Sequence, residues 1–195
     1  MESFITIGSI ATPLGRLGVV FSPSGLCRLA FAGEGAEACA AWARRWAPGA
    51  AVPHDDPRLD ALAGEIEGYC AGRLRAFATP LDLRGTPFQL AVWRAVLAVG
   101  YGETRAYSEV AAAIGRPLAI RAVGAANGAN PIPILVPCHR LIGKDGRLVK
   151  YGGGLDLKRR LLELEKAASA QRPGEAPARS FGKAGRGRGG PKVLP

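Results

Sequence analysis

The spacing of apolar residues predicts short strands in the first part of the chain. Apolar runs cover residues 4–7, 17–21 and 26–31, and Pro23-Ser24-Gly25 between the last two predicts a tight turn. No set of polar or reactive side chains converges in this region as a site would require. Its expected role is therefore that of a scaffold.

Two helices are expected after these strands. Residues 34–46 are rich in alanine, place Trp42 and Trp46 on one helical face, and end at Pro48-Gly49. Asp56-Pro57 then predicts a helix start, with the aspartate as N-cap and the proline at the first helical position. The apolar residues that follow on one helical stripe are Leu59, Leu62, Ile66 and Tyr69.

A second unit opens near residue 84. A capping-box pattern at Thr86–Gln89, with proline at the first helical position, predicts a helix from about 87 to 98. Helical patterns at 108–114 and 118–126 follow, separated by a turn that contains glycine and proline. Helix, short turn and helix are the outline of a helix-turn-helix. The same outline occurs in bundles that never bind DNA, so both interpretations stay open at this point.

The second of these helices, residues 118–126, is built largely from small residues, and Arg121 is its one long polar side chain. A helix that reads bases in the major groove needs several long donors and acceptors. A helix of small residues can instead bring its backbone close to a sugar-phosphate wall, as a minor-groove binder does. The alternative is a buried helix packed tightly through alanine and glycine. Arg121 favours DNA binding, because it has no obvious partner within its own helix.

Residues 134–140 read Ile-Leu-Val-Pro-Cys-His-Arg and bring candidate chemistry into the pattern. Pro137 favours a stiff, non-helical backbone at Cys138. A thiol is a strong nucleophile only as the thiolate, and a nearby imidazole such as His139 is the usual base. The pair alone does not decide the matter. Adjacent residues of an extended chain point to opposite faces, and a cysteine in an apolar run is by default a small buried hydrophobe.

A glycine-rich loop, Tyr151-Gly152-Gly153-Gly154, comes after the polar turn at 143–146. It matches neither a Walker nor a dinucleotide pattern, and its bare backbone would let a flat ligand approach closely. A last helix is expected at 157–166, capped by Asp156. Glu165 falls in its final turn, where the helix dipole disfavours a carboxylate. It is therefore either a surface residue or a group held there to orient a histidine.

The net charge of the chain indicates a class of binding partner. The chain has 195 residues, with 26 Lys and Arg against 16 Asp and Glu, which gives a net charge of +10. This favours a polyanionic partner, most simply nucleic acid, although a basic enzyme has the same composition. Residues 167–195 hold six basic residues, one acidic residue and few apolar side chains, which predicts a disordered tail. The tail either contacts nucleic acid or is dispensable.

Cysteine spacing and the N-terminus exclude several classes of protein. The four cysteines, Cys27, Cys39, Cys70 and Cys138, lack the close pairing of a zinc site. No apolar stretch is long enough to span a bilayer, and the N-terminus lacks the basic region of a secretory signal. We therefore expect a cytoplasmic protein with free thiols, no metal and no membrane association.

Taken together, the motifs resemble those of a known family. The residues that carry the resemblance are Tyr107, Arg121-Ala122-Val123-Gly124, Asn130-Pro131, Pro137-Cys138-His139-Arg140, Tyr151, Gly153-Gly154-Leu155 and Glu165. This pattern closely resembles the O6-alkylguanine-DNA alkyltransferases (methylated-DNA–protein-cysteine methyltransferases) and looks most like their bacterial members. It covers residues 84–166 without evident gaps and is looser over 1–83.

The resemblance implies an α+β fold in two domains. Residues 1–83 would form a small strand-plus-helix domain of the ribonuclease H-like type, which serves as a scaffold. Residues 84–166 would form a mainly helical, winged helix-turn-helix-like domain that binds DNA and carries the chemistry. The disordered basic tail, 167–195, lies outside the family pattern.

The resemblance also implies direct reversal of DNA alkylation by a monomer that uses no cofactor and no metal. The protein would bind duplex DNA containing alkylated guanine from the minor groove and rotate the damaged base out of the stack. The O6-alkyl group would then pass irreversibly to a cysteine. Each molecule would act once, because attack on a saturated carbon gives a thioether that water does not readily hydrolyse. The range of alkyl groups, and activity on O4-alkylthymine, stay open.

The same resemblance assigns residue roles. Cys138 would be the nucleophile, His139 would take its proton through a water, and Glu165 would orient the histidine. Asn130 would stiffen the loop behind the thiol. The residues expected to form the base pocket are Tyr107, which would also donate to the departing guanine, the carbonyl of Leu141, Tyr151, Gly152 and Gly153. The residues expected to contact DNA are Arg121, which would fill the gap in the duplex, Ser108, Arg116, Ala122, Gly124 and Lys144.

Two positions depart from the family pattern, and three rival functions need weighing. Gly152 stands where serine or alanine is frequent, and Lys150 where a small residue or asparagine is more usual. A non-catalytic alkyltransferase-like damage-recognition module is disfavoured, because Cys138 is intact. A sequence-specific helix-turn-helix regulator is disfavoured by the scarcity of base-reading side chains in 118–126. A thiol hydrolase would turn over an ester substrate, which an irreversible single turnover would exclude.

Overall fold

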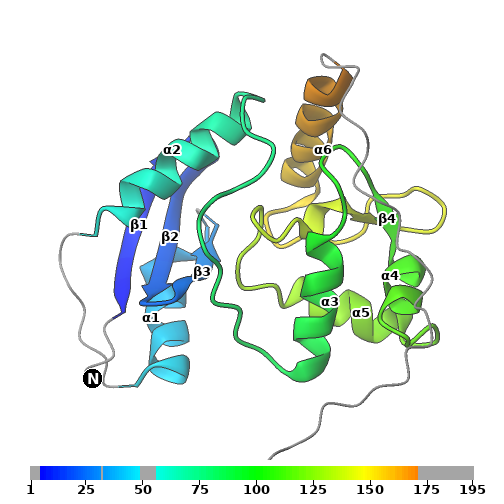
Figure 1. The fold of residues 1–195 in the computed structure, drawn as a ribbon, viewed down its shortest axis with the longest axis horizontal. Helices are drawn as coiled ribbons and strands as arrows, with labels where there is room; N and C mark the ends of the chain where they lie inside the picture. The colour runs from blue at the N-terminus through cyan, green and yellow to red at the C-terminus, as the bar shows by residue number, and fades with distance from the viewer. Residues whose placement is uncertain (1–4, 32, 49–55, 171–195) are drawn as a thin grey trace, which may run out of the picture.

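The computed structural model describes residues 5–31, 33–48 and 56–170. The first unit is an antiparallel sheet of β1 (Thr6–Thr12), β2 (Gly15–Ser22) and β3 (Gly25–Ala30), in the order β1-β2-β3. Two helices flank it, α1 (Gly35–Trp46) and α2 (Arg58–Cys70), as Figure 1 shows.

Alternating side chains of β2 bury both faces of this sheet. Leu17, Val19 and Phe21 belong to the main core, which also contains the apolar stripe of α2. Val20 belongs to a smaller cluster that includes Cys39 of α1. The two helices therefore pack on opposite faces of the sheet.

The second unit is mainly helical and lies to one side of the sheet (Figure 1). It begins with α3 (Pro87–Leu97), α4 (Tyr107–Ala113) and α5 (Ile120–Gly128), which pack on one another. The indole Nε1 of Trp93 donates to the carbonyl of Ala126 (2.9 Å), which ties α3 to α5 in the core.

The segments that carry the candidate chemistry follow these helices. A 3-10 turn, η1 (Cys138–Arg140), leads into β5 (Leu141–Ile142), which pairs in parallel with β4 (Arg105–Ala106). The last helix is α6 (Leu155–Ala170). Within the described ranges, no helix is long and apolar enough to cross a membrane.

The two units share one core and are joined by backbone hydrogen bonds at β3. Leu26 N donates to Pro80 O, and Asp82 N donates to Leu26 O, both at 2.8 Å. Leu29 N donates to Pro131 O, also at 2.8 Å. The strand β3 therefore contacts both the connection between the units and the loop that precedes Cys138.

Most of the expected elements are present, and the α+β arrangement is confirmed. The capping box is formed in both directions, since Gln89 N donates to Thr86 Oγ1 (3.2 Å) and Thr86 N donates to Gln89 Oε1 (2.9 Å). The strand expected at 4–7 belongs to β1, with Phe4 outside the described residues, as is Gly49 of the turn expected after α1. The helix expected at 118–126 begins and ends two residues later.

The second helix is assigned one residue later than expected. Helix α2 begins at Arg58, so Pro57 occupies the N-cap position and Asp56 lies one residue outside it. Asp56 Oδ1 nevertheless accepts from Arg58 N (3.0 Å), and its carboxylate also binds the Arg58 guanidinium and the Thr6 hydroxyl. The aspartate therefore caps the start of the helix through Arg58 N, and it also ties the helix to β1 through Thr6.

The bounds expected for the last helix are also wrong. It begins at Leu155, so Asp156 lies in its first turn and binds Arg159 (2.8 Å) instead of capping it. It continues to Ala170, so residues 167–170 are helical, and the rest of the expected tail lies outside the described residues. Glu165 is therefore not in the final turn, and the dipole penalty expected for it is small because that effect is confined to the last turn.

Candidate active site

Cys138 follows a buried loop. Residues 130–137 are all buried, and Ile134 adopts φ 77°, a conformation that is unusual for a β-branched residue. Cys138 itself begins the 3-10 turn η1, which differs from the non-helical backbone expected after Pro137. Because the chain turns here, the adjacent side chains of Cys138 (5% exposed) and His139 (0% exposed) are both buried.

Asn130 holds the two ends of this loop together. Its Nδ2 donates to Val136 O (2.9 Å), and its Oδ1 accepts from Ile132 N (3.0 Å). A second amide, Asn127 on α5, donates from Nδ2 to the carbonyl of Cys138 (3.3 Å). The backbone on either side of the thiol is therefore fixed by buried side-chain amides.

Glu165 lies at the centre of a buried polar network. Its Oε1 accepts from His139 Nε2 (2.8 Å), from Tyr69 Oη (2.7 Å) and from Arg140 Nη2 (2.9 Å). Its Oε2 accepts from Arg140 Nε (2.9 Å) and from Gly102 N (3.0 Å). Glu165 is fully buried, so the surface position considered for it is wrong, and the carboxylate does contact the histidine.

These contacts determine the protonation of the network. Burial raises the pKa of Glu165, but the hydrogen bonds from His139 and Arg140 outweigh it and bring the pKa down to about 2. An ionised carboxylate can only accept, so His139 Nε2 carries the proton and donates it. Burial lowers the pKa of His139, which keeps the imidazole neutral at pH 7. Nδ1 is then a free acceptor, and it is buried without a hydrogen-bond partner among the described residues.

The thiol is held in its protonated form at rest. Burial raises the pKa of Cys138, and a hydrogen bond with Asn130 and the charge of Lys158 offset part of that rise. Lys158 is itself fully buried on α6, and its Nζ donates to Leu141 O (2.5 Å) and Val149 O (3.2 Å). The carbonyl expected to face the base, that of Leu141, is therefore already bound to a cation.

Two adjoining cavities reach this region. The larger, about 610 Å³, is lined by Tyr107, Ser108, Ile120, Gly124, Ala125, Gly128, Gly143, Lys144, Val149, Lys150, Tyr151 and Gly152. A smaller one of about 120 Å³ is lined by Cys138, Asn127 and Asn130, among others. It shares four lining residues with the larger cavity, namely Gly128, Lys150, Tyr151 and Gly152. Cys138 therefore lines the smaller cavity, which borders the larger one at these shared residues.

Parallel pairing positions Tyr107. The register Ala106↔Ile142 brings the start of α4 beside the strand that follows η1. Burial raises the pKa of Tyr107, a hydrogen bond from Asn127 partly offsets this rise, and the phenol remains neutral. A neutral phenol at this wall can donate a proton or a hydrogen bond to a group in the cavity.

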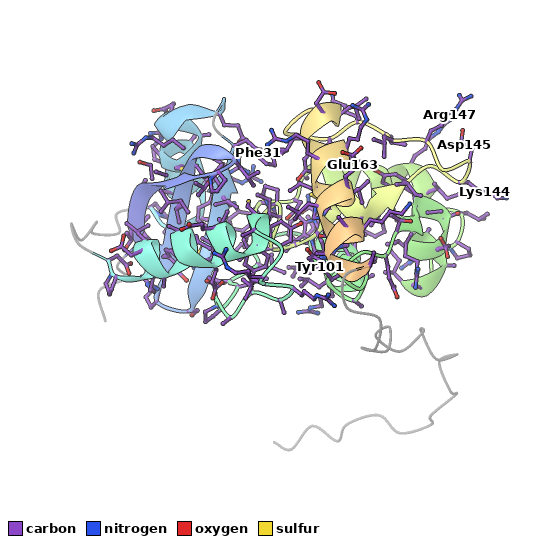
Figure 2. The ribbon with its side chains drawn as sticks, turned by 90° about the horizontal axis from the view of Figure 1, so that it is seen from above. Phe31, Tyr101, Lys144, Asp145, Arg147 and Glu163 are labelled. Carbon is purple, nitrogen blue, oxygen red and sulfur yellow. The ribbon has the colours of Figure 1, made fainter. Side chains whose placement is uncertain are left out.

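Gly153 does not reach either cavity. A Cβ added to it would lie 2.6 Å from Leu157 Cδ2 and 3.2 Å from Phe31 Cε1, so the residue packs against side chains of both units. Phe31 also makes an edge contact with Tyr151 (ring centroids 5.6 Å apart) and lies on the side of the first unit that faces the second (Figure 2). The glycine at 153 is thus required by packing, and Gly152 is the glycine that lines the cavities.

The outer face of α5 is open to solvent. Arg121, Ala122 and Ala125 are exposed, and a Cβ added to Gly124 would meet nothing within 4 Å. The buried helix considered for this segment is therefore wrong for this face, although Val123 and Ala126 pack inward. The other expected contacts Arg116 and Lys144 are also exposed, and Lys144 projects from the loop at the end of the molecule away from the sheet (Figure 2).

Three buried residues of the network were not identified as site residues from the sequence. Tyr69 appears there only as part of an apolar stripe, and Lys158, one of two lysines in the last helix, was not singled out. Arg140 belongs to the motif that carries the resemblance but had no assigned role. A lysine at a position that the helical spacing turns inward was the one signal available for Lys158.

Comparisons with known proteins agree with this geometry. The profile of the 6-O-methylguanine DNA methyltransferase, ribonuclease-like domain, matches residues 5–83, and that of the 6-O-methylguanine DNA methyltransferase, DNA binding domain, matches residues 87–167. The chain is 50% identical over 130 residues to the inducible methylated-DNA–protein-cysteine methyltransferase of Bacillus subtilis (strain 168), which covers 67% of this chain and 73% of that protein. It is 56% identical over 117 residues to the methylated-DNA–protein-cysteine methyltransferase of Mycobacterium tuberculosis (strain ATCC 25618 / H37Rv), covering 58% and 71%.

Solved structures of similar sequence also superpose on this chain. The crystal structure of Mycobacterium tuberculosis O6-methylguanine methyltransferase superposes with a TM-score of 0.73 at 42% identity, over 88% of this chain and 97% of that one. The structure of M. tuberculosis OGT in complex with DNA superposes with a TM-score of 0.69 at 44% identity, over 82% and 92%. The chain therefore belongs to the 6-O-methylguanine DNA methyltransferase family.

Proposed function

We propose that this protein repairs DNA by moving the alkyl group of O6-alkylguanine in a duplex onto Cys138. The observation that carries the proposal is a buried thiol that lines a small cavity adjoining a larger one, next to a neutral histidine whose Nε2 is bound to a buried carboxylate. Its relatives are named methylated-DNA–protein-cysteine methyltransferases, and a structural neighbour binds DNA. We expect it to act in the cytoplasm, as a monomer, with residues 84–166 carrying the chemistry.

The transfer is a single displacement in which His139 acts as the base. The Cys138 proton passes through a water to Nδ1 of His139, and Glu165 stabilises the imidazolium that results. The thiolate attacks the alkyl carbon, a C–S bond forms, and the C–O bond to guanine breaks. The electron pair leaves with the guanine oxygen, and Tyr107 donates a hydrogen bond to the departing base, which lowers the cost of its negative charge. Electrostatic stabilisation of this leaving group lowers the barrier.

The damaged base must leave the duplex to reach the thiol. We propose that α5 approaches the minor groove, where its small residues allow close contact, and that Arg121 fills the gap left by the extruded base. Tyr151 and Gly152 line the cavity for that base. The carbonyl of Leu141, which already accepts from Lys158 Nζ, would serve the base as an acceptor through its second lone pair. Ser108, Arg116, Ala122, Gly124 and Lys144 contact the DNA backbone. Asn130 keeps the loop before the thiol rigid.

Each molecule acts once. The product is a thioether, which lacks the carbonyl that makes a thioester open to hydrolysis. The reaction therefore consumes the protein in proportion to the lesions repaired. The range of alkyl groups, and activity on O4-alkylthymine, can be measured by testing duplexes that carry each lesion.

Intact-protein mass spectrometry tests this proposal directly. The protein is mixed with a duplex that carries one O6-methylguanine, and Cys138→Ala and Cys70→Ala are treated in parallel. We expect a gain of one methylene on the wild type and on Cys70→Ala, and none on Cys138→Ala. Tight binding to the lesion without any mass gain would favour the alternative, a non-catalytic damage-recognition module.

A further inference from the structure

The helix α2 of the first unit reaches the catalytic network through one side chain. Tyr69 lies in its last turn and is fully buried, and its hydroxyl donates to Glu165 Oε1 (2.7 Å). The same hydroxyl lies 3.4 Å from His139 Nε2. Figure 1 shows the end of α2 directed toward α6, which carries Glu165. A residue of the scaffold unit therefore touches the groups that control the base.

Tyr69 and His139 donate to the same carboxylate oxygen. Each hydrogen bond to an ionised carboxylate stabilises its charge and lowers its attraction for another proton. The Tyr69 hydroxyl thus reduces the negative charge that Oε1 offers to the imidazole. Arg140 and Gly102 N bind the other carboxylate oxygen. Together with these contacts, the Tyr69 hydroxyl fixes the orientation of the carboxylate.

The donor is permanent. Burial and the Glu165 carboxylate raise the pKa of Tyr69 far above its usual value, so the phenol is protonated at neutral pH. Its ring is packed against Phe77 and Tyr101, with centroids 5.3 Å and 6.0 Å away. Neither the proton nor the orientation of the hydroxyl is free to change.

We propose that Tyr69 is a positioning residue: its hydroxyl holds the Glu165 carboxylate in line with His139 Nε2 and limits the charge that the carboxylate offers to the imidazole. The inference rests on the proposed role of His139 as the base for Cys138. It makes the first unit a working part of the site, because removing α2 would remove this donor.

Other charged and titratable groups surround His139 and stay constant in the test. They are Cys138 and Arg140 on the same turn, Glu165 and Lys158 on α6, Tyr101 in the connection before β4, and Tyr151 in the loop before α6. Among the described tyrosines near Glu165, Tyr101 provides a matched control. Its ring packs on Tyr69, but its buried hydroxyl has no hydrogen-bond partner within the described part of the chain.

The experiment compares Tyr69→Phe with Tyr101→Phe. In Tyr69→Phe the carboxylate keeps more charge for the imidazolium, so the pKa of His139 should rise by about half a unit to one unit, the equivalent of one hydrogen bond. The imidazole is titrated by NMR, with His54→Gln used to assign the signals of the only other histidine. The acid limb of the pH profile for single-turnover methyl transfer should move by the same amount. Tyr101→Phe should move neither quantity.

Three results would overturn the proposal: an unchanged His139 pKa in Tyr69→Phe, an equal change in Tyr101→Phe, or a lower rate with an unmoved pH profile. If Tyr69→Phe does not fold, 3-fluorotyrosine placed at position 69 keeps the hydroxyl and makes it a stronger donor. The His139 pKa should then fall, and a rise would refute the idea. Because the NMR titration needs no substrate, it reports on Tyr69 even if the wild type transfers no methyl group.

Discussion

The network around Glu165 and the outer face of α5 differ in where their partners are. Glu165 is fully buried and accepts from four residues of the protein, which come from both units. On the face of α5, Arg121 is exposed, Gly124 has free space around it, and Leu118 just before the helix is 97% exposed. The first region has its polar partners within the protein, whereas the second presents its side chains to solvent.

This difference separates stability from binding. Substitutions in the network should lower the free energy of unfolding as well as the rate of transfer, because they leave buried groups unpaired. Substitutions on the outer face should change DNA binding with little cost to folding. The four predictions below run from the largest expected change in the free energy of unfolding to the smallest.

Replacing Glu165 should have the largest effect. Glu165→Ala leaves the buried Arg140 guanidinium without its counter-charge, which should lower the free energy of unfolding by about 3–5 kcal/mol. Urea unfolding followed by tryptophan fluorescence measures this loss. The control is Glu163→Ala, two residues away on the exposed side of the same helix (Figure 2), which should stay within about 0.5 kcal/mol of the wild type. Equal losses in the two variants would show that the network adds nothing.

Lowering the pH should lower the free energy of unfolding, first through His139 and then through Glu165. The pKa of His139 is lowered by folding from its ordinary 6.5, so the unfolded chain takes up a proton first. The contribution of the neutral His139 to the free energy of unfolding is complete above pH 6.5. It declines below pH 6.5, by up to about 1.4 kcal/mol per pH unit. Glu165, lowered to about 2 from 4.5, adds a second decline below pH 4.5.

Urea unfolding measured at steps between pH 8 and 5 tests this expectation. The decline below pH 6.5 should persist in His54→Gln and disappear in His139→Gln. A decline of the same size in both variants would assign it to groups outside the network.

Gly124→Ala should have opposite effects on folding and on binding. An added Cβ meets nothing within 4 Å, and alanine favours a helix over glycine by about 0.8–1.0 kcal/mol, so the variant should unfold at higher urea. Gly124 lines the large cavity, so the same methyl group should weaken binding to a methylated duplex in a fluorescence anisotropy titration. A variant that is more stable and binds DNA as well as the wild type would remove Gly124 from the interface.

Arg121→Ala should change stability least, by no more than about 0.5 kcal/mol, because the side chain is exposed. Its single-turnover rate on a paired duplex should fall by about tenfold or more, since the energy of unstacking a base is a few kcal/mol. The rate with free O6-methylguanine base should not change. A similar loss with the free base would mean that Arg121 acts on the thiol and not on the duplex.

Local patterns predicted the fold well where a few neighbouring residues determine the structure. The capping box at Thr86 and Gln89 needs only its own four residues, and it is formed as expected. The end of α6 was missed because residues 167–170 have the composition of the tail, yet Ala168 packs into the protein and its carbonyl accepts from Arg75 (2.7 Å). A contact between residues so far apart in the sequence cannot be predicted from the local pattern, so neither could the end of the helix.

The same limit applies to the site. The contact of Glu165 with His139 agrees with the role that the family resemblance implied, while the roles of the predicted residues stay to be tested. Tyr69 could not be identified, because an inward tyrosine on an apolar stripe is usually part of the core, and only the fold brings its hydroxyl to a carboxylate 96 residues away. Lys158 was missed for the same reason, since its partners are backbone carbonyls of distant segments.

The burial of Cys138 also affects how well the thiol resists oxidation before it reacts. Peroxide and other oxidants attack cysteines that are ionised and accessible to solvent, and the higher oxidation states cannot be reversed. A thiol that is 5% exposed and kept protonated by its surroundings is a poor target for such oxidants. If each molecule acts once, as proposed above, this burial would preserve the reactive thiol in the interval between synthesis and the first lesion.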